Sequence, residues 1–152
     1  MQKSTIFFKV GHRGAQAYEV ENTLKGFQRA IELGVNAIEF DVRATRDGKL
    51  IIFHDDNLER IFGVDLPVNQ TTLKELKRHS GNSIPTLSEA LRFINNKVEK
   101  ILIELKETGC EKRALSIIRR QKMQDRAIII SFHEQALSEM RQLDHKIETG
   151  LI

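Results

Sequence analysis

Two carboxylates stand two residues apart in an otherwise apolar stretch of the chain that runs from Val35 to Val42. If this stretch is a strand, Glu39 and Asp41 lie on the same face, because successive side chains point to opposite faces. Two like charges on a buried face repel each other and lose hydration, at roughly several kcal/mol each when they are unpaired. A divalent cation removes both penalties and prefers oxygen ligands. The pair therefore predicts a metal site.

A second apolar run, residues 100–106, also carries charge at alternate positions near its end. Glu104 and Lys106 share a face of this predicted strand. Either segment alone is equally compatible with a half-exposed strand that has solvated charges. Because the two runs end in the same way, we expect Glu39, Asp41 and Glu104 to meet in one polar pocket at the carboxyl ends of neighbouring strands.

Two histidines follow other apolar runs. The first lies in Gly11-His12-Arg13-Gly14, where the glycines allow a ligand to approach the backbone closely. Arginine offers paired donors that suit a phosphate group, and histidine transfers protons near neutral pH. The second, His54, is followed by Asp55. A glycine-rich turn with a surface histidine explains the first motif equally well, but two histidines at the ends of parallel strands would face the same pocket.

The elements that must position these residues alternate between strand-like and helix-like runs. Strands are expected at 5–10, 36–42, 50–53, 101–105, 127–131 and 148–152, and helices at 23–33, 71–79, 86–95, 111–121 and 134–143. Residues 55–70 are expected to be irregular because they contain Gly63 and Pro67. This alternation predicts an α/β fold, a TIM-type (β/α) barrel with about six of its eight strands, and the barrel is expected to be incomplete at the C-terminus.

Length and composition predict one domain over residues 1–152. The chain is 40% hydrophobic and 30% charged, and its 24 basic and 21 acidic residues are mixed, which disfavours nucleic-acid binding. Cys110 is the single cysteine, so no intrachain disulfide is expected. No apolar run approaches the length of a membrane span, and a soluble cytoplasmic protein is expected. The aromatic residues are assigned to the core: Phe7, Phe8, Phe27, Phe40 and Phe93.

The order and spacing of the motifs resemble the glycerophosphodiester phosphodiesterase family. The motifs are Gly11-His12-Arg13-Gly14, Glu21-Asn22-Thr23, Glu39-Phe40-Asp41, Arg46-Asp47-Gly48, His54-Asp55, Pro85-Thr86-Leu87 and Glu104-Leu105-Lys106. The resemblance covers essentially the whole chain. The sequence departs from the family pattern after Leu58-Glu59-Arg60. There, Ile61-Phe62-Gly63 replaces the threonine-rich segment that the family tends to have.

The resemblance implies a metal-dependent hydrolase of glycerophosphodiesters that belongs to lipid or glycerol metabolism. Glu39, Asp41 and Glu104 would bind the metal, with calcium or magnesium as the ion. Two basic side chains, Arg13 and Lys106, would bind the substrate phosphate. His12 and His54 would be the general base and the general acid, in that order. Whether water or a hydroxyl of the substrate attacks phosphorus first stays open.

Two other functions are compatible with the sequence. An amidohydrolase barrel would have two histidines one residue apart at its first strand, but Arg13-Gly14 follows His12 instead. A catalytically inactive remnant of the phosphodiesterase family would bind phosphorylated ligands or a partner chain. A homo-oligomer would cover the open edge of an incomplete barrel, which otherwise exposes unpaired backbone groups.

Overall fold

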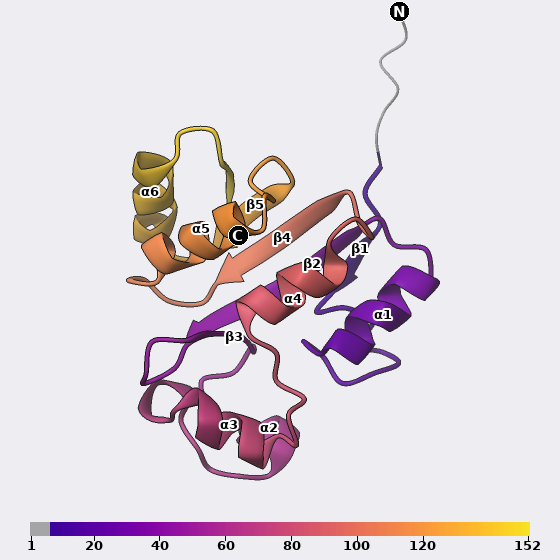
Figure 1. Ribbon diagram of the computed structural model, residues 1–152, viewed down its shortest axis with the longest axis vertical. Helices are drawn as coiled ribbons and strands as arrows, with labels where there is room; N and C mark the ends of the chain where they lie inside the picture. The colour runs from indigo at the N-terminus through magenta and orange to yellow at the C-terminus, as the bar shows by residue number, and fades with distance from the viewer. Residues whose placement is uncertain (1–6) are drawn as a thin grey trace, which may run out of the picture.

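The computed structural model describes residues 7–152 and contains one six-stranded sheet (Figure 1). The parallel strands lie side by side in the order β1, β2, β4, β5, β6. Their bounds are β1 Val10–His12, β2 Ala37–Ala44, β4 Lys100–Leu105, β5 Ala127–Ser131 and β6 Glu148–Leu151. Each parallel strand is followed by a helical segment before the next parallel strand begins, as a β/α fold requires. Within residues 7–152, β1 and β6 are the two edges of the parallel sheet.

The short strand β3, Leu50–Ile52, corrects one expectation. It pairs antiparallel with the end of β2, with Val42 opposite Ile52 and Ala44 opposite Leu50. The connection from β2 is a tight turn in which Gly48 adopts a φ of 71°. A parallel pairing needs a crossover of a dozen or more residues, and this connection is too short for one. The barrel strands within residues 7–152 therefore number five, and β3 extends the sheet beside β2.

The principal helices begin and end within two residues of the bounds that the sequence predicts. They are α1 Leu24–Glu32, α3 Leu73–His79, α4 Leu87–Ile94, α5 Glu111–Arg120 and α6 Glu134–Leu143. Thr23 caps α1 by accepting from the Gly26 N–H at 3.0 Å. Thr72 and Thr86 each form a capping box with the glutamate three residues later. Figure 1 shows α4 and α5 crossing the near face of the sheet.

The main hydrophobic core lies between the sheet and these helices. Ile38, Phe40 and Val42 point from β2 into this core, so the intervening residues of β2 point to the opposite face. The Phe27 ring of α1 packs 5.7 Å from that of Phe40. Both residues were assigned correctly, and Phe93 packs at the edge of the core. The assignment of Phe7 and Phe8 was wrong, because these side chains are 78% and 41% exposed before the edge strand β1 begins.

The first strand is shorter than the sequence predicts. The expectation covered residues 5–10, of which 5 and 6 lie outside the described residues, whereas β1 begins at Val10. Parallel pairing with β2 starts at Val10 opposite Ala37 and ends at His12 opposite Glu39. None of the helices formed by residues 7–152 combines the length and the apolar character that a membrane crossing needs.

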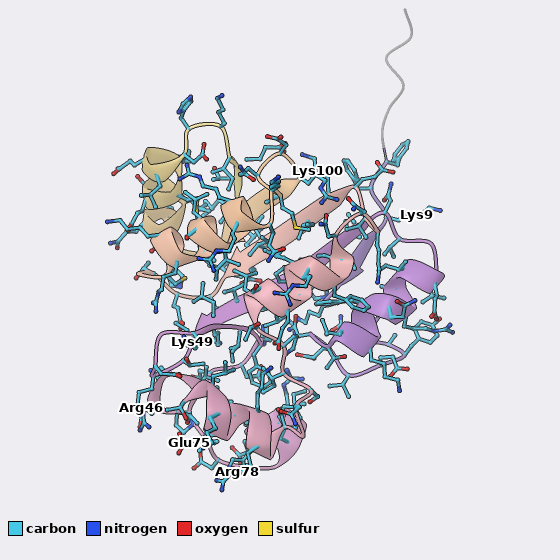
Figure 2. The ribbon with its side chains drawn as sticks, viewed as in Figure 1. Lys9, Arg46, Lys49, Glu75, Arg78 and Lys100 are labelled. Atoms are coloured by element: carbon cyan, nitrogen blue, oxygen red, sulfur yellow. The ribbon has the colours of Figure 1, made fainter. Side chains whose placement is uncertain are left out.

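Residues 58–84 fold into a small lobe around a second core. We expected residues 55–70 to be irregular, but they contain helix α2, Glu59–Phe62, and the 3-10 helix η1, Val68–Gln70. The Phe62 ring stacks 6.1 Å from Phe53, which follows β3. Figure 1 shows α2 and α3 below the sheet, and Figure 2 places Glu75 and Arg78 on this lobe, with Arg46 of the β2–β3 turn beside them and Lys9 and Lys100 at the other end. The lobe thus packs against the end of the sheet to which β2 points.

Candidate active site

Three buried carboxylates converge on the face of the sheet opposite the main core. Asp41 of β2 lies opposite Glu104 of β4 in the parallel ladder, and Glu39 precedes Asp41 by two residues. One oxygen from each of the three side chains lies within 4.8 Å of the other two. All three residues are buried, with exposed fractions of 0–6%. This arrangement offers three hard oxygen donors to one divalent cation.

The charges around this cluster are unevenly compensated. Burial raises the pKa of Glu39 to about 7, and repulsion from Asp41 and Glu104 adds to the effect. The backbone N–H of Arg13 opposes the shift by donating to Glu39 Oε2 at 2.9 Å. Asp41 Oδ1 is buried and has no hydrogen-bond partner among residues 7–152. A buried carboxylate oxygen without a donor fits a metal ligand better than a purely structural acid.

Asn22 holds Asp41 from the loop before α1. Its Nδ2 donates to Asp41 Oδ2 at 2.8 Å, and its Oδ1 accepts from the Asp41 backbone N–H at 3.3 Å. Asn22 is buried and adopts a φ of 57°, a conformation that asparagine tolerates better than most residues. No role in the site was predicted for Asn22. The motif Glu21-Asn22-Thr23 was the signal that could have identified this residue.

The turn after β1 brings Arg13 against the cluster. Arg13 itself has a φ of 52°, so its backbone N–H points at Glu39 while its side chain turns toward Asp41, with Nε 3.3 Å from Oδ2. A Cβ on Gly11 would lie 2.9 Å from the Gly14 carbonyl oxygen, and one on Gly14 would lie 2.8 Å from the backbone of Gly26. The two glycines are therefore required by close backbone contacts.

His12, at the end of β1, lies beside the cluster with a largely exposed ring. Its Nε2 is 3.7 Å from Glu39 Oε2, and its side chain is 58% exposed. The Gln16 side-chain amide lies 2.8 Å from Nδ1 and orients the ring so that Nε2 faces Glu39. His12 can therefore contact a molecule bound in front of the carboxylates.

His54 reaches the same stretch of β2 from the opposite direction. We expected it at the end of a parallel strand, but it follows the antiparallel β3, and the Phe53 N–H donates to the Asp41 carbonyl at 3.0 Å. The antiparallel return brings the chain back toward the carboxylates. Nδ1 of His54 lies 2.6 Å from Asp55 Oδ1, and a carboxylate in this position fixes the ring and leaves Nε2 free to exchange a proton.

A guanidinium links Asp55 to the turn after β1. Arg60 donates hydrogen bonds to Asp55 and to Glu21, and these bonds are the main reason why the pKa of each carboxyl group is lowered. The pKa of Asp55 falls to about 2. Glu21 also accepts from Arg13 Nη1 at 3.1 Å. Arg60 was quoted in the sequence motif, but its contacts were not foreseen. A polar loop residue has no periodic pattern that would show where its side chain points.

Lys106 supplies a second cation at the end of β4. Its Nζ lies 2.6 Å from Glu104 Oε1 and 3.6 Å from Asp41 Oδ1, so it spans two of the carboxylates. The Phe132 ring centroid is 5.8 Å from this ammonium. The exposed His133 contacts the Lys106 carbonyl through Nε2 at 3.1 Å. The end of β5 therefore supports the end of β4.

These groups converge at one end of the sheet: three acids, two cations and two imidazoles. Such a set can hold a divalent cation, bind the nonbridging oxygens of a phosphate ester and transfer protons on either side of the phosphorus. Comparison with known proteins is consistent with this chemistry. The family model described as "Glycerophosphoryl diester phosphodiesterase family" matches residues 12–152. The chain belongs to this family.

Sequence relatives in the glycerophosphoryl diester phosphodiesterase family are longer than this chain. A glycerophosphodiester phosphodiesterase of Caldanaerobacter subterraneus is 32% identical, and the match covers 94% of this chain and 65% of that protein. A second, from Bacillus altitudinis, is 31% identical over 93% of this chain and 64% of its own length. The chain thus spans slightly less than two thirds of these relatives.

Solved structures of the family share the fold. The glycerophosphodiester phosphodiesterase of Thermotoga maritima matches with a TM-score of 0.85 and 35% identity, over 96% of this chain and 62% of that one. A phosphodiesterase from Oleispira antarctica, solved with its product sn-glycerol-3-phosphate, matches with a TM-score of 0.83 and 31% identity, over 93% and 64% of the two chains. The fold class is therefore the TIM-type barrel, and residues 7–152 form an incomplete set of its strands.

Proposed function

We propose that this protein is a metal-dependent phosphodiesterase that hydrolyses glycerophosphodiesters to an alcohol and glycerol 3-phosphate. The observation that carries the proposal is the convergence of Glu39, Asp41 and Glu104 on one point beside His12 and Arg13. The Oleispira antarctica relative was solved with sn-glycerol-3-phosphate, which supports the same product here. A phosphodiester substrate explains why acids and cations share one site.

Glu39, Asp41 and Glu104 are the residues that would hold the ion, and calcium or magnesium suits these oxygen donors. Asp41 Oδ1, buried and without a hydrogen-bond donor, fits this role. When bound, such an ion acts as a Lewis acid on a phosphoryl oxygen. Glu104 is held in place by Lys106, and Asp41 by Asn22, so two of the three ligand residues are oriented by neighbours.

The remaining residues act on the substrate directly. Arg13 and Lys106, which lie against the carboxylates, would bind the nonbridging phosphate oxygens and neutralise the charge that develops there. His12 would take a proton from the attacking water, and His54 would give one to the oxygen of the departing alcohol as its bond to phosphorus breaks. The proton count balances, because water supplies one proton to the base and the alcohol receives one from the acid.

A second candidate is an inactive relative that binds phosphorylated ligands or a second copy of itself. In this candidate, a second copy would pair with the strand edges β1 and β6, where Val10 and Leu151 are 43% and 59% exposed. An unpaired strand edge is a template for pairing with another chain. We propose that a second copy of the chain covers these edges, so that the protein is a homo-oligomer. Sedimentation of the purified chain tests this oligomeric state. We propose the cytoplasm as the location of the protein.

The decisive experiment measures release of the alcohol from glycerophosphocholine and glycerophosphoethanolamine, with and without added calcium or magnesium. We expect turnover that requires the ion and that is abolished by Glu39→Ala and by His12→Ala. Arg119→Gln, in a helix away from the site, serves as a control and should leave turnover unchanged. Folded wild-type protein that binds the ion but releases no alcohol would overturn the enzymatic function in favour of the binding function.

A further inference from the structure

Arg60 connects two loops that carry proposed catalytic groups. Toward Asp55, its Nε donates to Oδ2 at 2.6 Å and its Nη2 to Oδ1 at 3.1 Å. Toward Glu21, its Nη2 donates to Oε1 at 2.6 Å and its Nη1 to Oε2 at 3.1 Å. One planar guanidinium thus holds two carboxylates, each through paired bonds, which is a geometry that lysine cannot reproduce.

Each of these carboxylates holds one further side chain of the site. Asp55 accepts from Nδ1 of His54 at 2.6 Å, and Glu21 accepts from Nη1 of Arg13 at 3.1 Å. The hydrogen bonds therefore run without interruption from the His54 imidazole through Arg60 to the Arg13 guanidinium. Glu21 precedes Arg60 by 39 residues, so the contact fixes segments that are distant in the sequence.

A packed turn sets the position of Arg60. The residue belongs to α2, which is preceded by the fully buried Leu58 and ends at Phe62, whose ring stacks on Phe53. Asn57 accepts from the Glu59 N–H at 2.9 Å and anchors the start of this turn. The apolar side chains of the turn point into the small lobe, while the guanidinium points the other way, across to Glu21.

We propose that Arg60 is a positioning residue, which aligns the His54 imidazole with the phosphate-binding Arg13 by clamping Asp55 and Glu21 between them. The inference rests on the proposed function for the roles of His54 and Arg13. An ordinary surface ion pair contributes little. This contact differs because it is bidentate on both sides and because the Asp55 and Glu21 side chains are only 20% and 13% exposed.

The test compares Arg60→Gln and Arg60→Lys with Arg119→Gln. Arg119 is a matched control, since its side chain is also 49% exposed and its Nη2 lies 2.8 Å from one carboxylate, that of Asp144. The first readout is independent of catalysis. It is the two-bond ¹H–¹⁵N NMR spectrum of the imidazole rings, in which the His54 signals are assigned by their loss in His54→Gln.

We expect the neutral His54 ring of the wild type to carry its proton on Nδ1, and the two nitrogen shifts to move toward each other in Arg60→Gln but not in Arg119→Gln. The second readout is steady-state hydrolysis of glycerophosphocholine with calcium. Loss of a residue that orients a catalytic group typically reduces activity about 10- to 100-fold. We expect a decrease of this size in Arg60→Gln, larger in kcat than in KM, with Arg60→Lys between it and the wild type.

The double variant Asp55→Asn/Arg60→Gln should lose less activity than the product of the two single losses, since both changes break the bonds between Arg60 and Asp55. The inference is overturned if Arg60→Gln matches Arg119→Gln in both the spectrum and kcat. If the wild type releases no alcohol, the proposed function fails, and the spectrum alone decides the role of Arg60. A changed His54 signal then supports positioning, and an unchanged one rejects it.

Discussion

Asn22 and Asp41 are joined by two hydrogen bonds, one to the Asp41 carboxylate at 2.8 Å and one from its backbone N–H at 3.3 Å. Asn22→Ala removes both, so Asp41 loses the group that orients it. We expect the affinity for calcium or magnesium to fall about 10- to 100-fold, as is typical for residues that orient metal ligands. Isothermal titration calorimetry with each metal salt measures this change.

Asn82→Ala is the matched control for this substitution. Asn82 has nearly the same backbone conformation, with φ at 62° against 57° for Asn22, but it is exposed and lies in the small lobe. Both variants lose the tolerance of asparagine for this conformation, and only one loses the bonds to Asp41. An equal loss of metal affinity in both variants would show that the amide does not matter.

Glu39→Gln should raise the stability of the metal-free protein and remove most of the stabilisation that a bound metal provides. Glutamine can still accept the Arg13 N–H, but it no longer repels Asp41 and Glu104, so we expect the metal-free protein to gain about 1 kcal/mol in the free energy of unfolding. Calcium at about 100 times its Kd should add about 2.7 kcal/mol to the wild type and little to the variant. Urea denaturation with calcium or with a chelator measures both quantities, and the exposed Glu32→Gln should keep the wild-type response.

Much of the fold follows from the sequence because its signals are local. Alternation of apolar and charged residues puts Glu39 and Asp41 on the same face, and Thr86 with Glu89 has the spacing of a capping box that defines the start of α4. The direction of β3 was not foreseen, because an apolar run does not show which way it pairs. The tight turn before it, which contains Gly48, held that information.

The small lobe and the hydrogen bonds around the site were harder to predict. Gly63 suggested a break, yet at φ 68° it ends helix α2 in the left-handed conformation. The contacts of Asn22 and Arg60 depend on how distant loops fold toward each other, and no local pattern records that. The approach of the three carboxylates was expected, because their register follows from the parallel pairing of β2 and β4.

Gly14→Ala should lower the free energy of unfolding, because the turn that carries Arg13 has no room for a side chain at residue 14. Gly14 has a φ of 85°, and an added Cβ would lie 2.8 Å from the Gly26 backbone and 2.9 Å from the Phe27 ring. Gly109→Ala is the control, because Gly109 has a φ of 86° with no atom within 4 Å of the added Cβ. We expect about 1 kcal/mol of destabilisation in the control and about 2–4 kcal/mol in Gly14→Ala. Equal values by urea denaturation would refute the close contact.

Asp55 makes the stability of the protein depend on pH in the acid range. Its pKa of about 2 in the folded protein lies below the ordinary 3.8, chiefly because Arg60 donates to it. Its contribution is thus fully present above about pH 5 and is lost as the pH falls through about 2. Allowing for solvent screening, we expect Asp55→Asn to lose about 1 kcal/mol of stability at pH 7 and to match the wild type near pH 1. The exposed Asp56→Asn should show a much smaller difference at pH 7.

The chemical nature of the leaving group distinguishes the roles of the two histidines. A general acid is needed when the departing alcohol is a poor leaving group, as in glycerophosphocholine, and is dispensable when p-nitrophenolate departs. If His54 is the acid, His54→Ala should lower kcat/KM about 10²- to 10⁴-fold for glycerophosphocholine but less than about tenfold for the p-nitrophenyl ester of glycerol phosphate. His12→Ala removes the base and should impair both substrates to a similar degree. The reverse pattern would exchange the two assignments, with His54 as the base, and would agree with the free Nε2 that Asp55 leaves on the neutral His54 ring.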